Sequence, residues 1–497
     1  MSCPVKVLEN AELGRYSVAD RNINAGEVLF EENPFAIGPK ADSFPVCLEC
    51  CRSVDGNAGG PKCPLCGWPM CEDCSENLNN IVNHKKECAL FVENKVKFQN
   101  VKDSNASCVQ LDCITPLRVL LQKEDQAERW NAEITLMEYH PDARKDTAIW
   151  KADQRNVVEY LRGPCGLKDC FSEELIQRVI GILAVNAFEA RTNCGSAIRG
   201  LYPKLAIMSH SCVPNVVHSI YPSDNYRLVA RAAVDVAEGE KLHTTYTYTL
   251  YGTSLRQNSL KVGKYFTCHC ARCLDPTELG THFSSLNCER CCNGLIESSN
   301  PLDDQADWKC THCEFTIKGE TALKKTQYMQ NEVDKVGCLN DGREKLDIYE
   351  RLLQNFTTIL HPLHFINTTI RDNLIQLYGR IPGYRMSELP DTLLERKVEL
   401  CKDVLKILNV FEPGKSRARA MVLYELHAPI VLLAKSNLSR GKLEVNEFKK
   451  KLELAIELLQ ECATILEWED SCTSEGILAR ISKQAALQLK QTRQMFS

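Results

Sequence analysis

Long apolar runs and an excess of positive charge are both missing from this sequence. No run of 18 or more apolar residues occurs, so the sequence predicts no membrane-spanning helix. The 60 Lys and Arg residues are outnumbered by 65 Asp and Glu, which gives a formal net charge of -5. Such a chain has no general attraction to nucleic acid or anionic membranes. Residues 1–10 also lack the charged-then-apolar pattern of a secretion signal, so we expect an intracellular protein.

Cysteine, by contrast, is abundant. The 497 residues include 27 cysteines, within a balance of 44% hydrophobic and 25% charged residues that is typical of folded domains. A chain of this length predicts two to four domains and is too large to need disulfides for stability. Many of the cysteines form Cys-x-x-Cys pairs, a spacing that lets two thiolates bind one tetrahedral zinc ion. The sequence therefore favours structural zinc over disulfide bonds.

Two stretches of the first half have the pattern of short strands. In residues 1–46 a small β-hairpin is predicted about the turn at 24–27, because apolar residues flank that turn: Val18, Ile23, Val28 and Phe30. Residues 186–250 are also β-like, with a Val- and Ala-rich run over 226–236 followed by a Glu-Gly-Glu turn. These two stretches predict the β part of the fold.

Helical patterns occupy two other regions. Ser172, followed by two glutamates, predicts a helix start, with apolar residues on one face: Leu175, Val179, Ile182 and Leu183. The last third is helical throughout, as the three-four spacing of two groups shows: Leu394, Val398, Cys401, Leu405 and Leu408, then Leu452, Ile456, Leu459, Ala463 and Leu466. We expect stacked antiparallel helices of tetratricopeptide-like type. An irregular helical domain without repeat ancestry stays open, because no clean 34-residue period is visible.

The first cysteine-rich block offers eight zinc ligands in order: Cys47, Cys50, Cys63, Cys66, Cys71, Cys74, His84 and Cys88. Eight protein ligands fill two tetrahedral sites and leave no open position, so both sites are structural. The block resembles the MYND zinc module, in which ligand pairs alternate between the metals. That resemblance implies one site of Cys47, Cys50, Cys71 and Cys74 and a second of Cys63, Cys66, His84 and Cys88. Cys51 is an extra thiol that could compete for a place.

Three further motifs follow one another near the middle of the chain. They are Ser209-His210-Ser211-Cys212-Val213-Pro214-Asn215, then Gly239-Glu240-Lys241-Leu242-His243-Thr244-Thr245-Tyr246, then Cys268-x-Cys270-x-x-Cys273. In this order they resemble the SET and post-SET signature of the SET and MYND (SMYD) protein-lysine methyltransferase family. The three post-SET cysteines need a fourth ligand, which gives a third zinc site: Cys212, Cys268, Cys270 and Cys273.

A last cysteine block has the spacing of a zinc ribbon: Cys288, Cys291, Cys310 and Cys313, with Cys292 as a spare thiol. The preceding linker, 275–280, resembles the arthropod-specific SmydA branch of the family. Weaker signs of the same branch lie at 412–414 and 423–427. Four structural zinc ions per chain are therefore expected.

The predicted fold class is α+β and multidomain, with a split, β-rich SET domain into which the MYND module is inserted. We expect its parts in this order: 1–46 the first part of SET, 47–88 the MYND module, 89–180 a helical SET insertion, 181–255 the SET core, 256–280 the post-SET segment, 281–318 the zinc ribbon and 319–497 an all-helical tetratricopeptide-like domain.

The resemblance also implies a chemistry, methyl transfer from S-adenosylmethionine to a neutral lysine amine. Such a displacement needs orientation and desolvation rather than a catalytic metal. By motif position Tyr246 is the tyrosine whose hydroxyl orients the reactants. The cofactor-binding residues carried over from the family are Gly14, Arg15, Tyr16, Asn186, Ser209, His210, Tyr246 and Phe266. Each of them has an alternative interpretation as a packed core residue.

Four positions of this pocket depart from the family pattern. Tyr16 replaces a second glycine of the first turn, Ser209 replaces an asparagine, Ala206 stands where serine is common, and Lys264 stands where active relatives carry tyrosine. Together they support an alternative function, a catalytically degenerate SET and MYND adaptor or transcriptional corepressor scaffold. A Cys–His nucleophile built from Cys212 and His210 is disfavoured, because residues so close in sequence rarely face each other.

Partners follow from the same resemblance. We expect protein substrates with a target lysine, histone or non-histone, and a protein-interaction surface on the MYND module. That module is net acidic, which favours proline-rich peptides over DNA. Trp68 is either part of a peptide groove or a core aromatic. We expect a monomer in the cytoplasm and nucleus, with a role in chromatin or transcription and no membrane partner.

Overall fold

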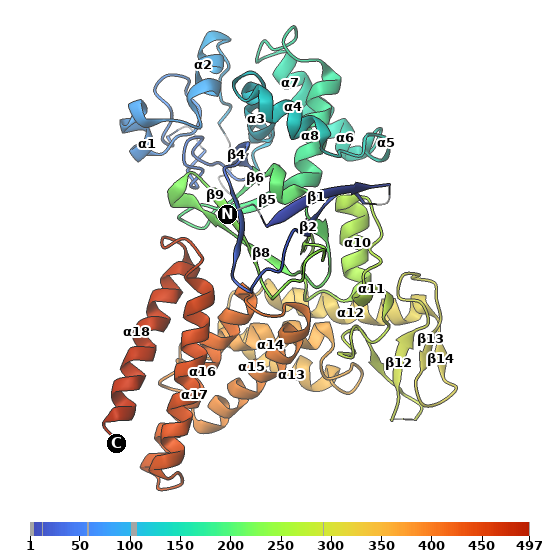
Figure 1. Ribbon diagram of the computed structural model, residues 1–497, viewed down its shortest axis with the longest axis vertical. Helices are drawn as coiled ribbons and strands as arrows, with labels where there is room; N and C mark the ends of the chain where they lie inside the picture. Colours follow the sequence, from blue (N-terminus) through green and yellow to red (C-terminus); the bar gives the residue numbers. More distant parts are fainter. Residues whose placement is uncertain (1–3, 12, 57–58, 101–106, 292, 497) are drawn as a thin grey trace.

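The computed structural model describes residues 4–11, 13–56, 59–100, 107–291 and 293–496. Short strands lie in the middle, the first zinc module and a group of short helices lie above them, and the long C-terminal helices lie below (Figure 1). A small four-stranded sheet projects to one side of those long helices. The predicted α+β fold is confirmed. Within the described part of the chain, no helix has both the length and the apolar character needed to cross a membrane.

The central strands form three small sheets and one short parallel pair, with orders β1-β2, β3-β9-β8, β4-β6-β5 and β7-β10. Strands from the start of the chain pair with strands far along it, since Val28 lies opposite Arg231 and Ala36 opposite Leu201. The β core is therefore split by the whole segment between β4 and β5. Its strands are β1 Val5–Asn10, β2 Gly14–Ala19, β3 Val28–Glu32, β4 Ala36–Pro39, β5 Ala187–Arg191, β6 Ala197–Leu201, β7 Ser209–His210, β8 Val216–Tyr221, β9 Arg227–Ala232 and β10 His243–Thr244.

The predicted hairpin between Val18 and Phe30 is wrong, although its turn exists. Glu27 N–H donates to Asn24 O at 3.0 Å, and Gly26 takes a left-handed φ of 92°. The strands on either side do not pair with each other, because β2 pairs with β1 and β3 pairs with β9. Apolar alternation identified the buried residues but carried no information about the distant strand that completes the sheet.

The inserted segment consists of short helices around one apolar core. Ser172 begins α8 as predicted, since its hydroxyl accepts from Leu175 N–H at 3.1 Å. Helix α3 packs against both α8 and β4, which joins the insertion to the β core. The helices are α1 Glu72–Glu76, η1 Leu78–Asn80, α2 Lys85–Glu93, η2 Val109–Cys113, α3 Ile114–Asp125, α4 Ala127–Ala132, η3 Ile134–Leu136, α5 Pro141–Arg144, α6 Ala148–Asp153, η4 Gln154–Val158, α7 Glu159–Arg162 and α8 Glu173–Asn186.

Two short elements lie between strands of the β core, α9 Pro203–Ala206 and η5 Pro222–Asp224. Two helices, α10 Thr253–Lys264 and α11 Ala271–Leu274, connect the core to the side sheet, whose strands are β11 Leu286–Asn287, β12 Leu295–Ser298, β13 Trp308–Cys310 and β14 Thr316–Ile317. The last four strands pair in sequence order and antiparallel, which is the meander expected of a zinc ribbon.

Seven long helices make up the C-terminal region, and each packs against the next in the chain. The apolar positions predicted on two of them are largely buried, Leu452 and Leu459 completely. This region meets the β core through the loop before α18, where Asp470 accepts from Ser223 N–H at 2.8 Å. The helices are α12 Gly319–Gly337, α13 Gly342–Phe356, α14 Phe365–Leu377, α15 Asp391–Phe411, α16 Arg417–Ser439, α17 Val445–Leu466 and α18 Ser474–Gln494.

Candidate active site and zinc centres

Sixteen predicted zinc ligands gather into four clusters, with the ligand atoms of each cluster all within 4.8 Å of one another. The clusters are Cys47, Cys50, Cys71 and Cys74; Cys63, Cys66, His84 and Cys88; Cys212, Cys268, Cys270 and Cys273; and Cys288, Cys291, Cys310 and Cys313. Two thiolates at about 2.3 Å from one tetrahedral zinc stand about 3.8 Å apart. The sulfurs of Cys63 and Cys88 are 3.7 Å apart, and those of Cys288 and Cys313 are 3.8 Å apart. The geometry of all four clusters fits tetrahedral zinc.

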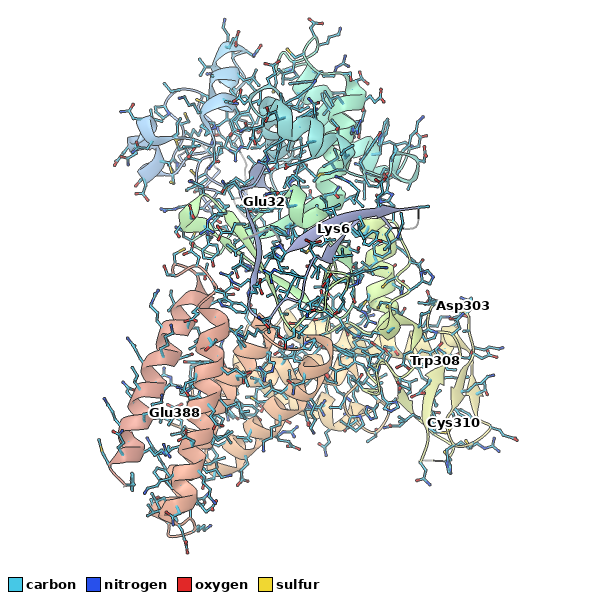
Figure 2. All side chains as sticks on the ribbon, in the orientation of Figure 1. Lys6, Glu32, Asp303, Trp308, Cys310 and Glu388 are labelled. Atoms are coloured by element: carbon cyan, nitrogen blue, oxygen red, sulfur yellow. The ribbon has the colours of Figure 1, made fainter. Side chains whose placement is uncertain are left out.

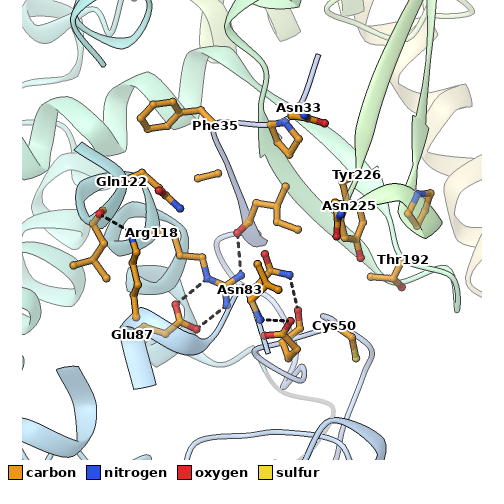
Figure 3. Close-up of a pocket in the computed structure, with 18 of the residues that line it drawn as sticks. Asn33, Phe35, Cys50, Asn83, Glu87, Arg118, Gln122, Thr192, Asn225 and Tyr226 are labelled. Atoms are coloured by element: carbon orange, nitrogen blue, oxygen red, sulfur yellow. Dashed lines mark hydrogen bonds and ion pairs between the residues drawn. The ribbon is translucent and has the colours of Figure 1, made fainter. Parts of the chain in front are cut away.

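The cluster that contains His84 is tied to the rest of the molecule by a buried ion pair. His84 Nδ1 lies 2.8 Å from Glu87, and Glu87 in turn binds Arg118 of α3 at 2.6 Å. Arg118 also donates to the carbonyls of Ile37, at 2.9 Å, and Leu48. Figure 3 shows the Arg118–Glu87 pair at the edge of a cavity. A carboxylate behind a metal-binding histidine fixes the orientation of the ring, so Glu87 and Arg118 support the zinc site.

The post-SET cluster has a comparable support. Arg256 Nε donates to the Cys212 sulfur at 3.2 Å, and Arg256 pairs with Glu278 at 2.8 Å. Arg272 pairs with the same carboxylate at 2.9 Å, and all three charged side chains are almost completely buried. The guanidinium groups offset the negative charge of the thiolates. Sequence reasoning missed Arg118, Arg256 and Arg272, because nothing in their local pattern marks them. Only the His84-x-x-Glu87 spacing could have indicated the support.

Burial decides between the alternatives that the sequence left open for Cys51 and for Trp68. Cys51 is completely buried and lies in none of the four clusters, in a small apolar group with Ile37 and Ala190. Trp68 is also completely buried and stacks on Phe91 with a centroid distance of 4.3 Å, so it is a core aromatic and lines no groove. The spare thiol Cys292 lies outside the described residues.

The zinc ribbon lies apart from the first zinc module. Figure 2 shows its residues Trp308 and Cys310 on the side sheet, away from that module.

His210 organises the candidate catalytic pocket. Its Nδ1 accepts from Tyr246 N–H at 3.0 Å, and its Nε2 lies 3.3 Å from the sulfur of Cys212. Its ring is 5.3 Å from the Tyr246 ring and 6.0 Å from the Phe266 ring, centroid to centroid. The histidine thereby joins the post-SET zinc cluster to the two aromatic side chains. The structure brings these three predicted site residues together.

Tyr246 presents a neutral phenol in this pocket. Its hydroxyl donates to the carbonyl of Met208, and burial raises the pKa of Tyr246 to about 12. Tyr248, two residues along, is instead 54% exposed. The Tyr246 hydroxyl is therefore oriented by a hydrogen bond to a main-chain carbonyl, whereas the neighbouring Tyr248 points to solvent.

Asn186 and Arg15 meet at the same short segment of the insertion. The Asn186 amide donates to Glu138 O at 2.8 Å, and Arg15 donates to Leu136 O at 3.0 Å. Gly14 takes a left-handed φ of 63°, and no atom lies within 4 Å of the place where its Cβ would be. Tyr16 lies with its ring 5.4 Å from the Lys241 ammonium.

Two buried polar atoms of the pocket region lack a partner. Ser209 and His243 lie opposite each other in the β7–β10 pair, and the described residues offer no hydrogen-bond partner to Ser209 Oγ or His243 Nδ1. Buried polar atoms are normally satisfied, so these two atoms are candidates to bind a polar group of a ligand or a water molecule. Of the other departures from the family pattern, Ala206 ends α9 and packs against the core of the insertion. Lys264 reaches the pocket itself, 5.6 Å from the Tyr246 ring centroid.

A cavity of about 560 Å³ lies on the other side of the β core, between the first zinc module and the strands. Figure 3 shows its wall, with Asn83 and Cys50 from the module, Asn33 and Phe35 from the strand side, and Tyr226 opposite. It is separate from the catalytic pocket, since none of its lining residues is a predicted cofactor residue.

Comparison with known proteins agrees with this arrangement. Residues 14–247 match the SET domain family, a span that begins at Gly14 and includes Tyr246. The SET domain-containing protein SmydA-8 of Drosophila melanogaster, isoform A, is 33% identical over 330 residues, which are 65% of this chain and 67% of that protein. Isoform B is 28% identical over 66% of this chain and 71% of its own length. N-lysine methyltransferase SMYD2-B of Danio rerio is 26% identical over 52% of this chain and 58% of its own length. This chain therefore belongs to the SMYD family of SET domain proteins, in its arthropod SmydA branch.

Proposed function

We propose that this chain is a protein-lysine N-methyltransferase that uses S-adenosylmethionine. The observation that carries the proposal is one arrangement of side chains. His210 accepts a hydrogen bond from Tyr246 N–H, the Tyr246 hydroxyl donates to the Met208 carbonyl, and the Tyr246 and Phe266 rings lie edge to face. Relatives that match this chain include proteins named N-lysine and histone-lysine methyltransferases.

Each side chain has a distinct task in this proposal. Bound S-adenosylmethionine supplies an activated methyl group on a sulfonium sulfur. Phe266 offers a face for the adenine ring, and Asn186, Ser209 and His243 supply polar atoms for the rest of the molecule. The Tyr246 hydroxyl and nearby carbonyls orient the lysine amine, and the pocket removes water from it, which favours the neutral, nucleophilic form. No group of the chain forms a covalent bond to the substrate.

Calorimetric titration with S-adenosylmethionine is the first test, because the cofactor must bind before any methyl group can be transferred. We expect one site per chain, with binding weakened in Phe266→Ala and retained in Tyr246→Phe. Transfer of labelled methyl groups to a library of lysine-containing peptides then tests catalysis. A natural chain that binds no S-adenosylmethionine would instead support the adaptor, whose case rests on four departures from the family residues: Tyr16, Ala206, Ser209 and Lys264.

We also propose that the first zinc module binds proline-rich peptides at the cavity of about 560 Å³. A polyproline segment leaves its carbonyls free, and the cavity wall offers donors to them: Arg52, Asn83, Lys86, Gln122 and Gln126. Val82, 72% exposed at the rim, supplies an apolar contact.

Fluorescence anisotropy with a labelled proline-rich peptide tests whether the peptide binds at this cavity. Val82→Asp should weaken binding about 10-fold, as loss of one apolar side chain in an interface does. Leu65→Asp, at a residue of the module that is 61% exposed but does not line the cavity, should leave it unchanged.

A further inference from the structure

Lys264 is the last residue of α10, and its side chain crosses to α8 instead of pointing to solvent. Its Nζ donates to the carbonyl of Val185, in the last turn of α8, and lies 5.6 Å from the centroid of the Tyr246 ring. Lys261, one turn earlier on α10, is exposed and makes no such contact within the described chain. The two lysines share a helix but differ in environment.

The surroundings of Nζ are those of an amine-binding site. A backbone carbonyl accepts a hydrogen bond from Nζ, and an aromatic ring lies beside it. No carboxylate of the described residues is within ion-pair distance of Nζ. A carbonyl and an aromatic ring are what a protein uses to hold an ammonium group without neutralising it. Burial also lowers the pKa of Lys264, which favours the neutral amine. Val185 is followed directly by Asn186, a residue proposed to bind the cofactor.

A purely structural role is the competing explanation. Val185 is among the last four residues of α8, whose carbonyls lack partners inside the helix, and a lysine that binds one of them stabilises the helix end. An arginine at position 264 would serve that role equally well. It would not serve as a methyl acceptor for a lysine methyltransferase. Lys264→Arg therefore separates the two roles.

We propose that Lys264 is a methylation site of the chain itself, with Nζ in the position of the substrate amine and the transfer occurring within one molecule. The proposal rests on the proposed function. In the reaction the neutral Nζ uses its lone pair to form an N–CH₃ bond. The S–C bond of S-adenosylmethionine breaks, its electron pair stays on sulfur to give S-adenosylhomocysteine, and one proton is released to solvent.

The first experiment needs no turnover. The natural chain, without S-adenosylmethionine, is treated with a limiting amount of an amine-acylating reagent, and labelling is measured at each lysine by peptide mass spectrometry. Lys264 should react at least about 10-fold more slowly than Lys261, because its amine is hydrogen-bonded and half-buried. Equal labelling of the two lysines would show that Nζ does not occupy the pocket and would overturn the proposal.

The second experiment adds S-adenosylmethionine and locates new methyl groups by tandem mass spectrometry. We expect mass increases of one or more methyl groups at Lys264 and none at Lys261. The rate per chain should not change over a 10-fold range of protein concentration. Tyr246→Phe should slow the modification about 100-fold. Lys264→Arg should abolish it with the fold intact, and Lys261→Arg should leave it unchanged.

The outcomes separate this proposal from the proposed function. If peptide lysines are methylated and Lys264 is not, the proposal is wrong and the function stands. If the rate at Lys264 rises in proportion to protein concentration, the transfer is between molecules and the internal geometry is wrong. If the chain neither binds S-adenosylmethionine in the calorimeter nor methylates any lysine, the proposed function fails and this inference fails with it.

Discussion

The zinc-bearing regions and the C-terminal helices hold themselves together in different ways. Beside two of the four cysteine clusters, side chains of opposite charge are buried next to metal ligands, in the Arg118–Glu87 and Arg256–Glu278 pairs. In α15 to α17 the buried residues are mostly aliphatic, such as Leu400, Ile407 and Leu452. The first arrangement depends on an ion and on charge pairing, whereas the second depends mostly on apolar area, with one buried ion pair between Lys397 and Glu425 at 2.6 Å. The catalytic pocket is built on the first kind of region.

Removal of zinc is the strongest way to test this contrast. A structural zinc site contributes on the order of 10 kcal/mol to the folding of its module, so a strong chelator should unfold the zinc modules before the C-terminal helices. Hydrogen exchange followed by mass spectrometry should show rapid exchange in residues 47–88 and slow exchange in α15–α17. Metal analysis before chelation should find about four zinc ions per chain, one for each cluster. Equal exchange in both regions would mean that the whole chain depends on the metals.

Breaking one buried ion pair is the next largest perturbation. Arg118→Met removes the guanidinium partner of the buried Glu87 carboxylate and leaves it only His84, which should lower the free energy of unfolding by about 3–5 kcal/mol. Leu452→Ala in α17 should cost a similar amount, about 2–5 kcal/mol, through lost apolar contacts. Only the first change should also weaken zinc retention, measured by the rate of release to a colorimetric chelator. Arg52→Met, which breaks an exposed pair with Asp73, is the control and should cost less than about 1 kcal/mol.

Two substitutions in the pocket should separate chemistry from cofactor binding. Tyr246→Phe removes a hydroxyl but keeps the ring, so turnover should fall about 100-fold, or about 3 kcal/mol, with cofactor affinity nearly unchanged. Phe266→Ala should have the opposite effect and weaken cofactor binding. Kinetics and calorimetry measure the two quantities separately. A Tyr246→Phe variant that methylates as fast as the natural protein would show that the hydroxyl has no catalytic role.

The smallest effect concerns a carboxylate between the two kinds of region. Glu32, labelled in Figure 2, accepts from Lys204 N–H at 2.9 Å, and burial raises its pKa from 4.5 to about 7. The folded state therefore holds the proton more tightly than the unfolded state, so stability should fall as pH rises from about 4.5 to about 7. Denaturant titrations should show a decline on the order of 1–3 kcal/mol. Glu32→Gln should flatten it, and the exposed neighbour Glu31→Gln should not.

Much of this organisation could be predicted from local patterns. The spacing of the cysteines and His84 marked all sixteen ligands that the structure gathers into four clusters, because metal ligands must lie close in space. Ser172 marked the start of α8, because a capping hydroxyl acts on its own next turn. The partners of β3, the Arg118–Glu87 pair and the destination of Lys264 could not be predicted. Each of these contacts joins distant parts of the chain through packing, which no local pattern records. The predicted domain boundaries stay predictions.

The pairing of β3 with β9 has a consequence for how the protein is made. On the ribosome, β3 emerges about 200 residues before the strand that completes its sheet. At roughly 5–20 residues per second, its open edges wait for roughly 10–40 s. The first zinc module and α3 are synthesised during that interval, and Arg118 already binds the carbonyl of Ile37 in the adjacent strand β4. Zinc supply during translation should therefore decide whether these early strands are shielded or are free to aggregate.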